Sequence, residues 1–359
     1  MGIKYNILYI SSFASLQGGG QRSLYLLLKY LNKDMFRPFL VVPEKGELLE
    51  KASRLGIKCF VIKFSRLKSL NIFSFLFDFI RLWKIIDKEK IALIHTDSPR
   101  QTIYAGLVRK IYYLPVVFHL RTSDVLPIID RMLYTLVDCL IAVSKCVAQR
   151  FRLIDRKNKL RVVYNGVELE SFFALDRDTH SRVLKVGYFG RIERRKGIEI
   201  LIKAIKRVKG RSDVVIMGDG DNRYLEELRT LAKGENVIFK KYKSDVSEDM
   251  KKVEVVVLPS LKEEGLSRVV IESMALGKVV VVSDLCSNRE ALGNEFEEFI
   301  FPVGNDFKLA SIIERIANDR NIIFQNQKKL RKRAEELFDI KKNTQEIEKI
   351  YIAIIKKAI

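Results

Sequence analysis

The feature that most constrains the fold is a set of short strands that are hydrophobic on both faces. The runs VEVVVLP (residues 253–259) and GKVVVVSD (277–284) show no alternation of polar and apolar side chains. Such runs are typical of parallel strands that helices cover on both sides. Amphipathic helix patterns separate them from similar strands along the whole chain. We therefore predict an α/β protein built from doubly wound parallel sheets.

The strand and helix patterns form two successions, and 359 residues suffice for two domains. The pattern stops in the polar segment at 168–182 and restarts at Leu184. Ligands are expected where the carboxyl ends of the strands meet. The predicted parts are an N-terminal domain over 1–170, a linker over 171–181, a second domain over 182–330, and a C-terminal helical segment over 331–359 that packs back on the first domain.

The cysteines indicate a reducing compartment. They show neither CxxC nor metal-ligand spacing, so free and mostly buried thiols are expected for Cys59, Cys139, Cys146 and Cys286. The opening residues are typical of a first strand, with too short an apolar run for a secretory signal. No segment has the length of a charge-free membrane span. We therefore predict a cytoplasmic protein.

Positive charge is concentrated in the first half of the chain. The net charge is +21, and residues 1–168 hold 28 Lys and Arg against 13 Asp and Glu. This indicates an anionic partner, such as membrane phospholipid, phosphorylated lipid or nucleic acid, unless it reflects a lysine-rich proteome. The aromatic and basic segment at 65–90 is typical of an amphipathic helix on anionic lipid. Packing against the N-terminal sheet is the alternative explanation for its apolar face.

The stretch GYFGRIERRKGIEILIKAI (187–205) predicts a strand, a turn at Gly190 and a helix from about Gly197. Arg191 and Lys196 lie on the loop between them, at the carboxyl edge of the sheet. Two cations there can hold a diphosphate and stabilise it as a leaving group without a metal. A solvated charged loop is the alternative.

The stretch from Pro259 to Asp284 predicts a second such loop. Glycine and serine before a helix starting near Ser267 let backbone N–H groups approach an anion. Glu264 and Glu272, with seven residues between them, can accept hydrogen bonds from sugar hydroxyls. Together these groups suit an enzyme that handles a sugar nucleotide.

GRIERRKG followed by EGLSRVVIE resembles the retaining glycosyltransferases of family four over nearly the whole chain. A Gly-rich loop near the N-terminus, AVS at 142–144 and YNGV at 164–167 follow the family's order. The E-x7-E pair is the most specific signal, and GRxxxxKG is moderately specific. The resemblance implies the GT-B fold, in which two Rossmann-like domains face each other across a cleft, with the acceptor on the N-terminal side.

The resemblance also implies roles for single residues. Arg191 and Lys196 would bind the donor diphosphate, Glu264 the transferred sugar and Glu272 the ribose hydroxyls. Arg268 departs from the commoner EGFGL form of the loop. Glu263 is an alternative to Glu264 as the residue that contacts the sugar, and the spacing of seven residues to Glu272 favours Glu264. Backbone amides would cap the phosphate at Gly265, Leu266 and Ser267.

Further roles fall on weaker motifs. His119 resembles the family's histidine near the transferred sugar, although a core histidine is an equal alternative, and His95 is a weaker acceptor-side candidate. Arg121 follows His119 and could order either substrate. The glycines that would approach the donor are Gly18, Gly19 and Gly20 in the N-terminal loop and Gly190 and Gly218 in the second domain.

These implications predict a metal-independent, cofactor-free retaining hexosyltransferase. It would move a sugar from a nucleotide-diphosphate donor, UDP-sugar favoured over GDP-sugar, to a hydroxyl of a lipid-linked or polysaccharide acceptor. The expected process is the synthesis of a cell-surface polysaccharide, such as capsule or lipopolysaccharide, by a protein peripherally attached to the inner face of the cell membrane. A GT-B sugar-nucleotide epimerase and a non-catalytic membrane or glycan adaptor are the alternatives. Nucleic-acid binding is disfavoured because no RNP-like or recognition-helix motif is present.

Overall fold

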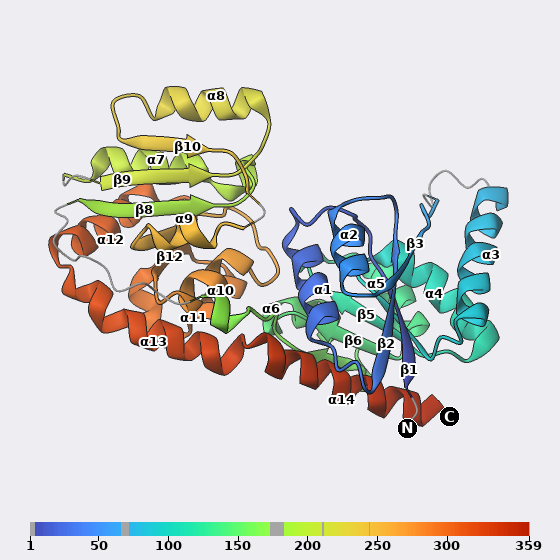
Figure 1. Ribbon diagram of the computed structural model, residues 1–359. Helices are drawn as coiled ribbons and strands as arrows, with labels where there is room; N and C mark the ends of the chain where they lie inside the picture. Colours follow the sequence, from blue (N-terminus) through green and yellow to red (C-terminus); the bar gives the residue numbers. More distant parts are fainter. Residues whose placement is uncertain (1–3, 66–71, 173–182, 210–211, 244, 359) are drawn as a thin grey trace. The chain divides into compact units, whose positions relative to one another are not determined.

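The computed structural model describes residues 4–65, 72–172, 183–209, 212–243 and 245–358. They form two compact units (Figure 1): unit 1 comprises Met1–Gly166 with Ile340–Ile359, and unit 2 comprises Val167–Asp339. Each unit contains one parallel sheet, which confirms the predicted doubly wound α/β fold. Of the linker expected at 171–181, all but the first two residues lies outside the described residues.

Unit 1 is built on a seven-stranded sheet in the order β3-β2-β1-β4-β5-β6-β7. All its strand pairs are parallel, and the order reverses between the neighbours β1 and β4. The strands are β1 (Tyr5–Ile10), β2 (Phe36–Val42), β3 (Lys58–Val61), β4 (Leu93–Thr96), β5 (Val116–Leu120), β6 (Cys139–Ala142) and β7 (Leu160–Val162). Ligands of such sheets bind at the carboxyl ends of the strands where the order reverses.

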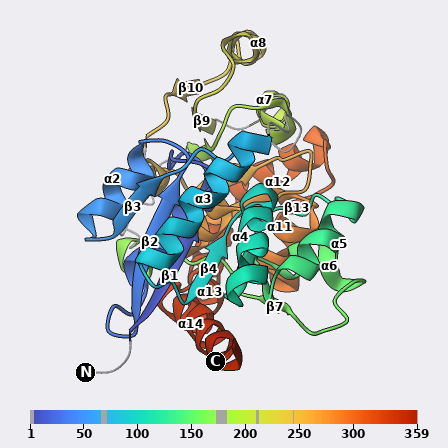
Figure 2. The ribbon, with the colours of Figure 1, turned by 90° about the vertical axis from the view of Figure 1, so that its right-hand side faces the viewer.

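The helices of unit 1 connect consecutive strands, apart from the C-terminal helix. They are α1 (Gly19–Tyr30), α2 (Glu47–Arg54), α3 (Ile72–Lys88), α4 (Pro99–Tyr112), α5 (Pro127–Leu136), α6 (Lys145–Arg152) and α14 (Ile340–Ala358). Figure 2 shows α3 and α4 side by side, as their contacts require. None of the described helices is long and apolar enough to cross a bilayer.

The C-terminal helix α14 completes the core of unit 1. It lies beside α1 (Figure 1), and Ile347, Tyr351 and Ile355 are buried with side chains of β1 and β2. A Cβ atom on Gly166 would collide with the backbone of Ile340, so this glycine permits the two chain segments to touch. The domain boundary expected at residue 330 falls inside α13 (Asn321–Leu337), and the chain enters unit 1 only at Ile340.

Unit 2 is built on a six-stranded parallel sheet in the order β10-β9-β8-β11-β12-β13. Its strands are β8 (Leu184–Phe189), β9 (Ser212–Met217), β10 (Val237–Lys240), β11 (Val255–Leu258), β12 (Val279–Ser283) and β13 (Ile300–Phe301). Its α-helices are α7 (Ile198–Arg207), α8 (Asn222–Leu231), α9 (Ser247–Lys251), α10 (Arg268–Ala275), α11 (Cys286–Leu292), α12 (Asp306–Asn318) and α13. Three 3-10 turns complete it: η1 (Leu169–Ser171), η2 (Arg194–Lys196) and η3 (Asn294–Phe299).

The two valine-rich strands are neighbours in the interior of this sheet. β11 and β12 pair in register from Val255 with Val279 to Leu258 with Val282, and every residue of both strands is buried. Each buried valine contributes about 1.5–3 kcal/mol of hydrophobic stabilisation. The strand order reverses between β8 and β11. The loops that follow these two strands are the loops that the sequence singled out.

Candidate active site

The two loops at the carboxyl edge of the unit 2 sheet meet through Lys196 and Glu264. Lys196 ends η2, after β8, and its Nζ lies 2.7 and 2.6 Å from the two carboxylate oxygens of Glu264 in the loop after β11. Ser260 Oγ donates a third hydrogen bond, at 2.7 Å, to Glu264 Oε1. Only 11% of the Lys196 side chain and 18% of the Glu264 side chain are exposed. The sequence predicted both residues for the site but not that they bind each other.

This pairing sets the charge of Glu264. Burial raises the pKa of its carboxyl, but the charge and hydrogen bonds of Lys196 and the hydroxyl of Ser260 outweigh it, so that the pKa lies below its ordinary value. Glu264 is therefore ionised at neutral pH. An ionised carboxylate accepts hydrogen bonds, so this group suits the binding of hydroxyls rather than the donation of a proton.

The neighbouring glutamate has a different position. Glu263 accepts hydrogen bonds from the backbone N–H groups of Cys286 at 2.8 Å and Ser287 at 3.1 Å, at the start of α11. It therefore caps that helix. Glu263 and Glu264 therefore have different partners, and the choice of Glu264 as the residue that contacts the sugar stays a prediction.

Glu272 is the second carboxylate of the motif and lies on α10, 2% exposed. Its Oε1 accepts hydrogen bonds from Nε and Nη2 of Arg268, at 3.0 and 2.7 Å. The two residues are one helical turn apart, the spacing at which charged side chains pair on a helix. Arg268, which the sequence showed only as a departure from the commoner loop, thus holds the predicted ribose-binding glutamate in place.

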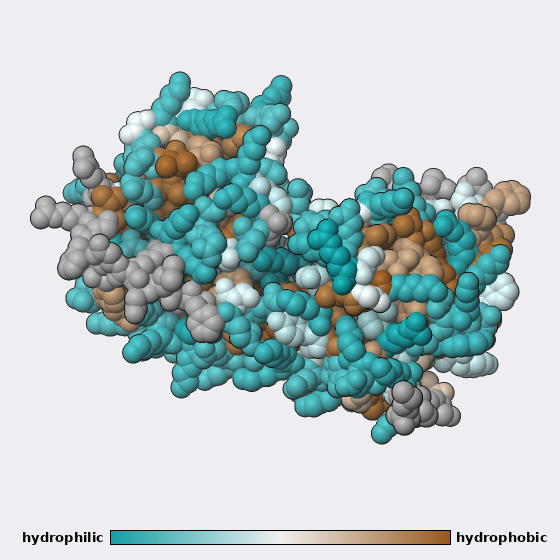
Figure 3. Space-filling view, in the orientation of Figure 1, coloured by the Kyte–Doolittle hydropathy of each residue, from teal (hydrophilic) through white to brown (hydrophobic). Residues whose placement is uncertain are grey.

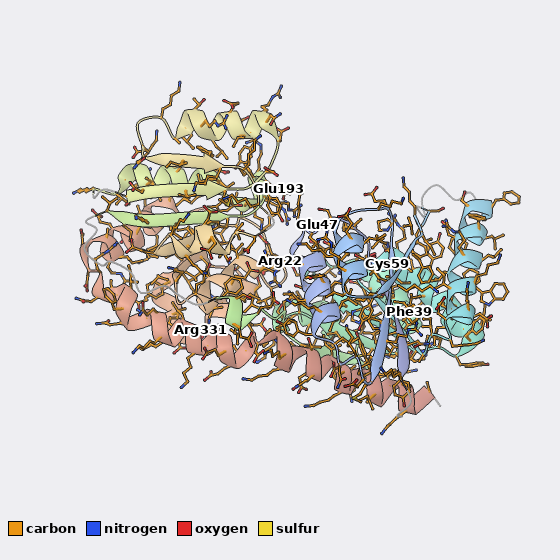
Figure 4. The ribbon with its side chains drawn as sticks, in the orientation of Figure 1. Arg22, Phe39, Glu47, Cys59, Glu193 and Arg331 are labelled. Atoms are coloured by element: carbon orange, nitrogen blue, oxygen red, sulfur yellow. The ribbon has the colours of Figure 1, made fainter. Side chains whose placement is uncertain are left out.

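Arg191 has a different environment from Lys196. About half of its side chain (54%) is exposed, and its Nη1 lies 2.7 Å from Glu193 Oε1. Glu193, labelled in Figure 4, also accepts a hydrogen bond from Arg195 Nε at 2.8 Å. The hydroxyl of Tyr188 fixes the backbone by donating to the carbonyl of Arg191 at 2.7 Å. Arg191 is therefore a solvent-facing cation on an anchored loop.

Two glycines allow this loop to approach its neighbour. Gly190 has φ of +153° and donates its N–H to the carbonyl of Met217 at 3.0 Å. A Cβ atom on Gly218 would collide with the carbonyl oxygen of Gly190. Gly190 therefore requires glycine for its positive φ and Gly218 for the contact of the two backbones, a structural role beside the predicted approach to the donor.

The amino end of α10 lies between the two glutamates. Ser267 is its N-cap residue, and its side chain makes no capping hydrogen bond in the described structure. The helix dipole gives this end a partial positive charge. Gly265, Leu266 and Ser267 thus lead into a helix start at the predicted position, and the binding of a phosphate by their backbone amides stays a prediction.

In unit 1, the predicted glycines lie at the start of α1. Gly18 is the N-cap residue, Gly19 and Gly20 open the helix, and a Cβ atom on Gly20 would lie 3.0 Å from Arg121 Cδ. Arg121 directly follows β5, the strand that carries His119. The structure therefore brings the glycine loop to the residues at the end of β5.

The two histidines of neighbouring strands form a buried pair. Nε2 of His95, on β4, lies 3.1 Å from Nδ1 of His119, on β5. Burial and the charge of Arg121 lower the pKa of His95 to about 3 and hold the pKa of His119 well below its ordinary value, with His95 adding to the latter shift. Both imidazoles are therefore neutral. The sequence treated them as separate candidates, although their places on consecutive strands were a signal of contact.

Asp97 is a residue that the sequence analysis missed. It follows β4 and accepts hydrogen bonds from Ser12 N at 2.9 Å and Ser11 Oγ at 3.1 Å. The pKa of Asp97 lies above its ordinary value, because burial outweighs the opposing effects of the Arg121 charge and of these two hydrogen bonds. No group of three or more His, Cys, Asp or Glu side chains in the described ranges is arranged to hold a metal ion.

Two family models match the chain. Residues 17–171 match Glycosyltransferase Family 4, and residues 176–337 match Glycosyl transferases group 1. The first match contains the glycine loop and the histidine pair. The second contains Arg191, Lys196 and both glutamates of the motif.

Relatives of known name share about a quarter of the residues. A Campylobacter jejuni protein named N,N'-diacetylbacillosaminyl-diphospho-undecaprenol alpha-1,3-N-acetylgalactosaminyltransferase is 25% identical, over 82% of this chain and 86% of its own length. An Escherichia coli protein named UDP-Gal:alpha-D-GlcNAc-diphosphoundecaprenol alpha-1,3-galactosyltransferase is 23% identical, over 95% of each.

Solved structures share the fold. A glycosyltransferase from Rickettsia africae superposes with a TM-score of 0.86 at 20% identity, over 98% of this chain and 99% of its own. The Anabaena protein HepE, in complex with UDP and glucose, superposes with a TM-score of 0.81 at 20% identity, over 96% and 98%.

Proposed function

Because the chain belongs to the group 1 glycosyltransferases of the GT-B fold, we propose that it is a retaining enzyme acting on a UDP-sugar. It transfers the sugar to a hydroxyl of a lipid-linked or polysaccharide acceptor in the synthesis of a cell-surface polysaccharide. The observation that carries the proposal is the Lys196–Glu264 pair beside the start of α10, where the strand order of unit 2 reverses. This arrangement combines a cation, a helix start and an ionised carboxylate at the edge where such sheets bind nucleotides.

The positive groups of this edge suit a diphosphate leaving group. Lys196 is buried and held in one geometry, Arg191 is exposed and close in sequence, and the amino end of α10 adds backbone N–H groups. Fixed cations and dipoles stabilise charge that develops on a leaving group without reorganising at the moment of reaction. We therefore propose that departure of UDP needs no metal ion.

Retention is supported by the reaction that a relative's name describes, and the partners of Glu264 bear on the role of this carboxylate. Bound to Lys196 and Ser260, this carboxylate suits a contact with a sugar hydroxyl better than attack on the anomeric carbon. In the proposed mechanism the acceptor attacks from the face that UDP leaves, and the donor phosphate takes the proton of the acceptor hydroxyl. The name of the Escherichia coli relative gives UDP-Gal as donor and an alpha-1,3 linkage as product. UDP-galactose itself carries an α-linked sugar, so that reaction keeps the configuration.

The acceptor class is supported by two relatives, whose names specify undecaprenol diphosphate acceptors. An exposed surface on α3 supports the proposed contact with such lipids. Its buried face, with Leu82 and Ile86, packs in unit 1, while an apolar stripe stays exposed (Figure 3), formed by Phe73, Phe77, Ile80 and Trp83. Exposed cations on the same helix are Arg81, Lys84 and Lys88. Apolar side chains among cations are typical of adsorption to anionic lipid, so we propose peripheral attachment at the inner face of the cell membrane.

The donor site is tested with purified protein and a panel of UDP-, GDP- and ADP-sugars. Donors that bind raise the melting temperature, because they bind only the folded state. Lys196→Ala and Glu272→Ala should abolish transfer, whereas Lys332→Ala, an exposed change on α13, should not. Undiminished turnover in either site variant contradicts the assignment. Turnover unaffected by EDTA supports metal independence, and loss that magnesium restores contradicts it.

The same assay separates the alternative functions. Interconversion of two UDP-sugars without an acceptor would identify an epimerase. Donor binding with neither hydrolysis nor transfer would identify an adaptor.

The membrane surface is tested by flotation with vesicles that contain phosphatidylglycerol. The double variant Phe77→Glu/Trp83→Glu should lose most binding. Leu153→Glu, which changes an exposed apolar residue elsewhere in unit 1, should retain it. Equal flotation of both variants would refute the role of α3.

A further inference from the structure

A chain of four buried side chains runs through unit 1, from the histidine pair to the C-terminal helix. Tyr351 Oη, on α14, lies 2.6 Å from His95 Nδ1 and donates a hydrogen bond to Tyr9 Oη at 3.2 Å. His95 Nε2 lies 3.1 Å from His119 Nδ1. Each of these four residues is at most 4% exposed. Every bond of the chain is therefore shielded from water.

The protonation of each member is fixed. Burial and the charge of Arg121 lower the pKa of both histidines, so each imidazole is neutral and carries one N–H. Burial raises the pKa of both tyrosines well above neutral pH, so each phenol carries one proton. One proton per side chain means that the direction of one hydrogen bond determines the direction of the others.

The bond from Tyr351 to Tyr9 sets the donor and acceptor of every other hydrogen bond in this series. Since its hydroxyl donates to Tyr9, its oxygen must accept from His95 Nδ1–H. His95 Nε2 is then a bare acceptor, which takes the proton of His119 Nδ1–H. The remaining nitrogen of His119, Nε2, is left with a lone pair. Nε2 is buried and has no hydrogen-bond partner among the described residues.

We propose that His95 and Tyr351 are positioning residues, which fix the tautomer of His119 that leaves its Nε2 bare to accept a substrate hydroxyl, the contact that the family resemblance implies for this histidine. The proposal rests on the proposed transferase function and deepens it. A bare imidazole nitrogen attracts hydroxyl and amide donors and repels the oxygens of phosphates and carboxylates. His119 therefore selects the sugar or acceptor hydroxyl and not the diphosphate. Because Tyr351 lies on α14, this helix helps to fix the orientation of the substrate contact at His119.

The histidine tautomers can be measured in the full-length protein without any ligand. Uniform labelling of histidine with 15N distinguishes protonated from bare ring nitrogens, and His180→Gln, His95→Gln and His119→Gln assign the three residues. The expected spectrum has a protonated Nδ1 and a bare Nε2 on both His95 and His119. A proton on Nε2 of either residue would overturn the inference.

The Tyr9→Phe variant tests the chain of bonds. Without its acceptor on Tyr9, the hydroxyl proton of Tyr351 turns to His95 Nδ1, and both histidines switch to the opposite tautomer. His119 Nε2 then presents an N–H to the substrate hydroxyl, so kcat/KM should fall about tenfold or more. Tyr104→Phe removes a hydroxyl that is also buried in unit 1 but lies outside this chain, and it should change neither tautomers nor kinetics.

Ligand titration separates this inference from the function on which it rests. UDP-glucose, UDP-galactose and UDP-N-acetylglucosamine are the probes, and UDP without a sugar is the control. The probe that raises the melting temperature most, with acceptor where needed, should shift the His119 Nε2 resonance, while UDP alone should not. If no probe binds, the proposed function fails and the substrate contact fails with it. If probes bind and react but Tyr9→Phe behaves like Tyr104→Phe, this inference alone is refuted.

Discussion

Replacement of Lys196 by methionine tests the central contact of the candidate site. Methionine keeps the length and apolar stem of lysine but removes its charge. In the variant the Glu264 carboxylate keeps the hydroxyl of Ser260 but loses both bonds to Nζ. A buried carboxylate without its cation is costly, so unit 2 should lose stability even in the absence of substrate.

The size of the loss follows from the burial of the pair. Removing one partner of a buried ion pair costs about 3–5 kcal/mol, and the residual exposure of 11% and 18% places this pair at about 3 kcal/mol. For a unit of this size, each kcal/mol lowers the melting temperature by about 2–4 °C, so about 6–12 °C is expected. Lys332, 77% exposed and 3.9 Å from Glu336, is the matched control on the same unit and should change it little.

The loss should depend on pH in a defined direction. In the native protein the folded pKa of Glu264 is depressed, so the pair's stabilisation is present above the unfolded pKa and is lost as pH falls through the folded value. In Lys196→Met burial acts without the lysine and raises the folded pKa, so the destabilisation of the variant sets in as pH rises above the unfolded pKa and is complete above the raised folded pKa. The difference in melting temperature should therefore be large at pH 7 and shrink below about pH 4, near the ordinary carboxyl pKa.

Calorimetry or circular dichroism over this pH range measures the effect. The double variant Lys196→Met/Glu264→Gln removes the stranded charge and should be more stable than Lys196→Met at pH 7. If the single variant is as stable as the control, or if its loss is the same at pH 4 and pH 7, the reasoning about a buried ion pair is refuted.

Three other changes have defined outcomes. Gly218→Ala should lower the melting temperature more than Gly234→Ala. The Cβ atom at 218 would collide with the backbone of Gly190, whereas the Cβ atom at 234 would have no neighbour and the only penalty would be the positive φ of that residue. Glu263→Gln should weaken the cap of α11 and leave transfer measurable, while Glu264→Gln should abolish it in the same rate assay. Deletion of 340–359 should unfold unit 1, because three buried side chains of its core are removed. The expected signs are a loss of near-ultraviolet circular dichroism and an increase in the binding of a hydrophobic dye.

The strands were predictable because an uninterrupted run of apolar residues indicates a strand that is buried on both faces. VEVVVLP and GKVVVVSD lack any polar alternation, and they became the fully buried neighbours β11 and β12. The convergence of the two site loops followed from the rule that parallel strands end at one edge. The boundary near residue 330 was less accessible, because the helical pattern of α13 continues across it to Leu337.

The contacts within the site were harder to predict. Lys196 and Glu264 are 68 residues apart, and no local pattern reports which of several cations a carboxylate will meet. The Arg268–Glu272 bond, by contrast, lies at the i,i+4 spacing and was readable from the sequence alone. Comparison with the EGFGL form of the loop does not reveal this bond, because that motif ends at Arg268 and does not include Glu272.

The four cations of the loop GRIERRKG differ in burial and in their partners. Glu193 pairs with Arg191 and Arg195, and Arg194 pairs with Glu227 near solvent, while Lys196 alone among these four cations is buried. A cation held by a carboxylate needs no reorganisation to stabilise a leaving group, whereas an exposed arginine must be ordered first. Glu264 would then act twice, by contacting the sugar and by orienting Lys196. The effects of removing Glu264 and Lys196 on turnover cannot be additive, because either change disables the same unit.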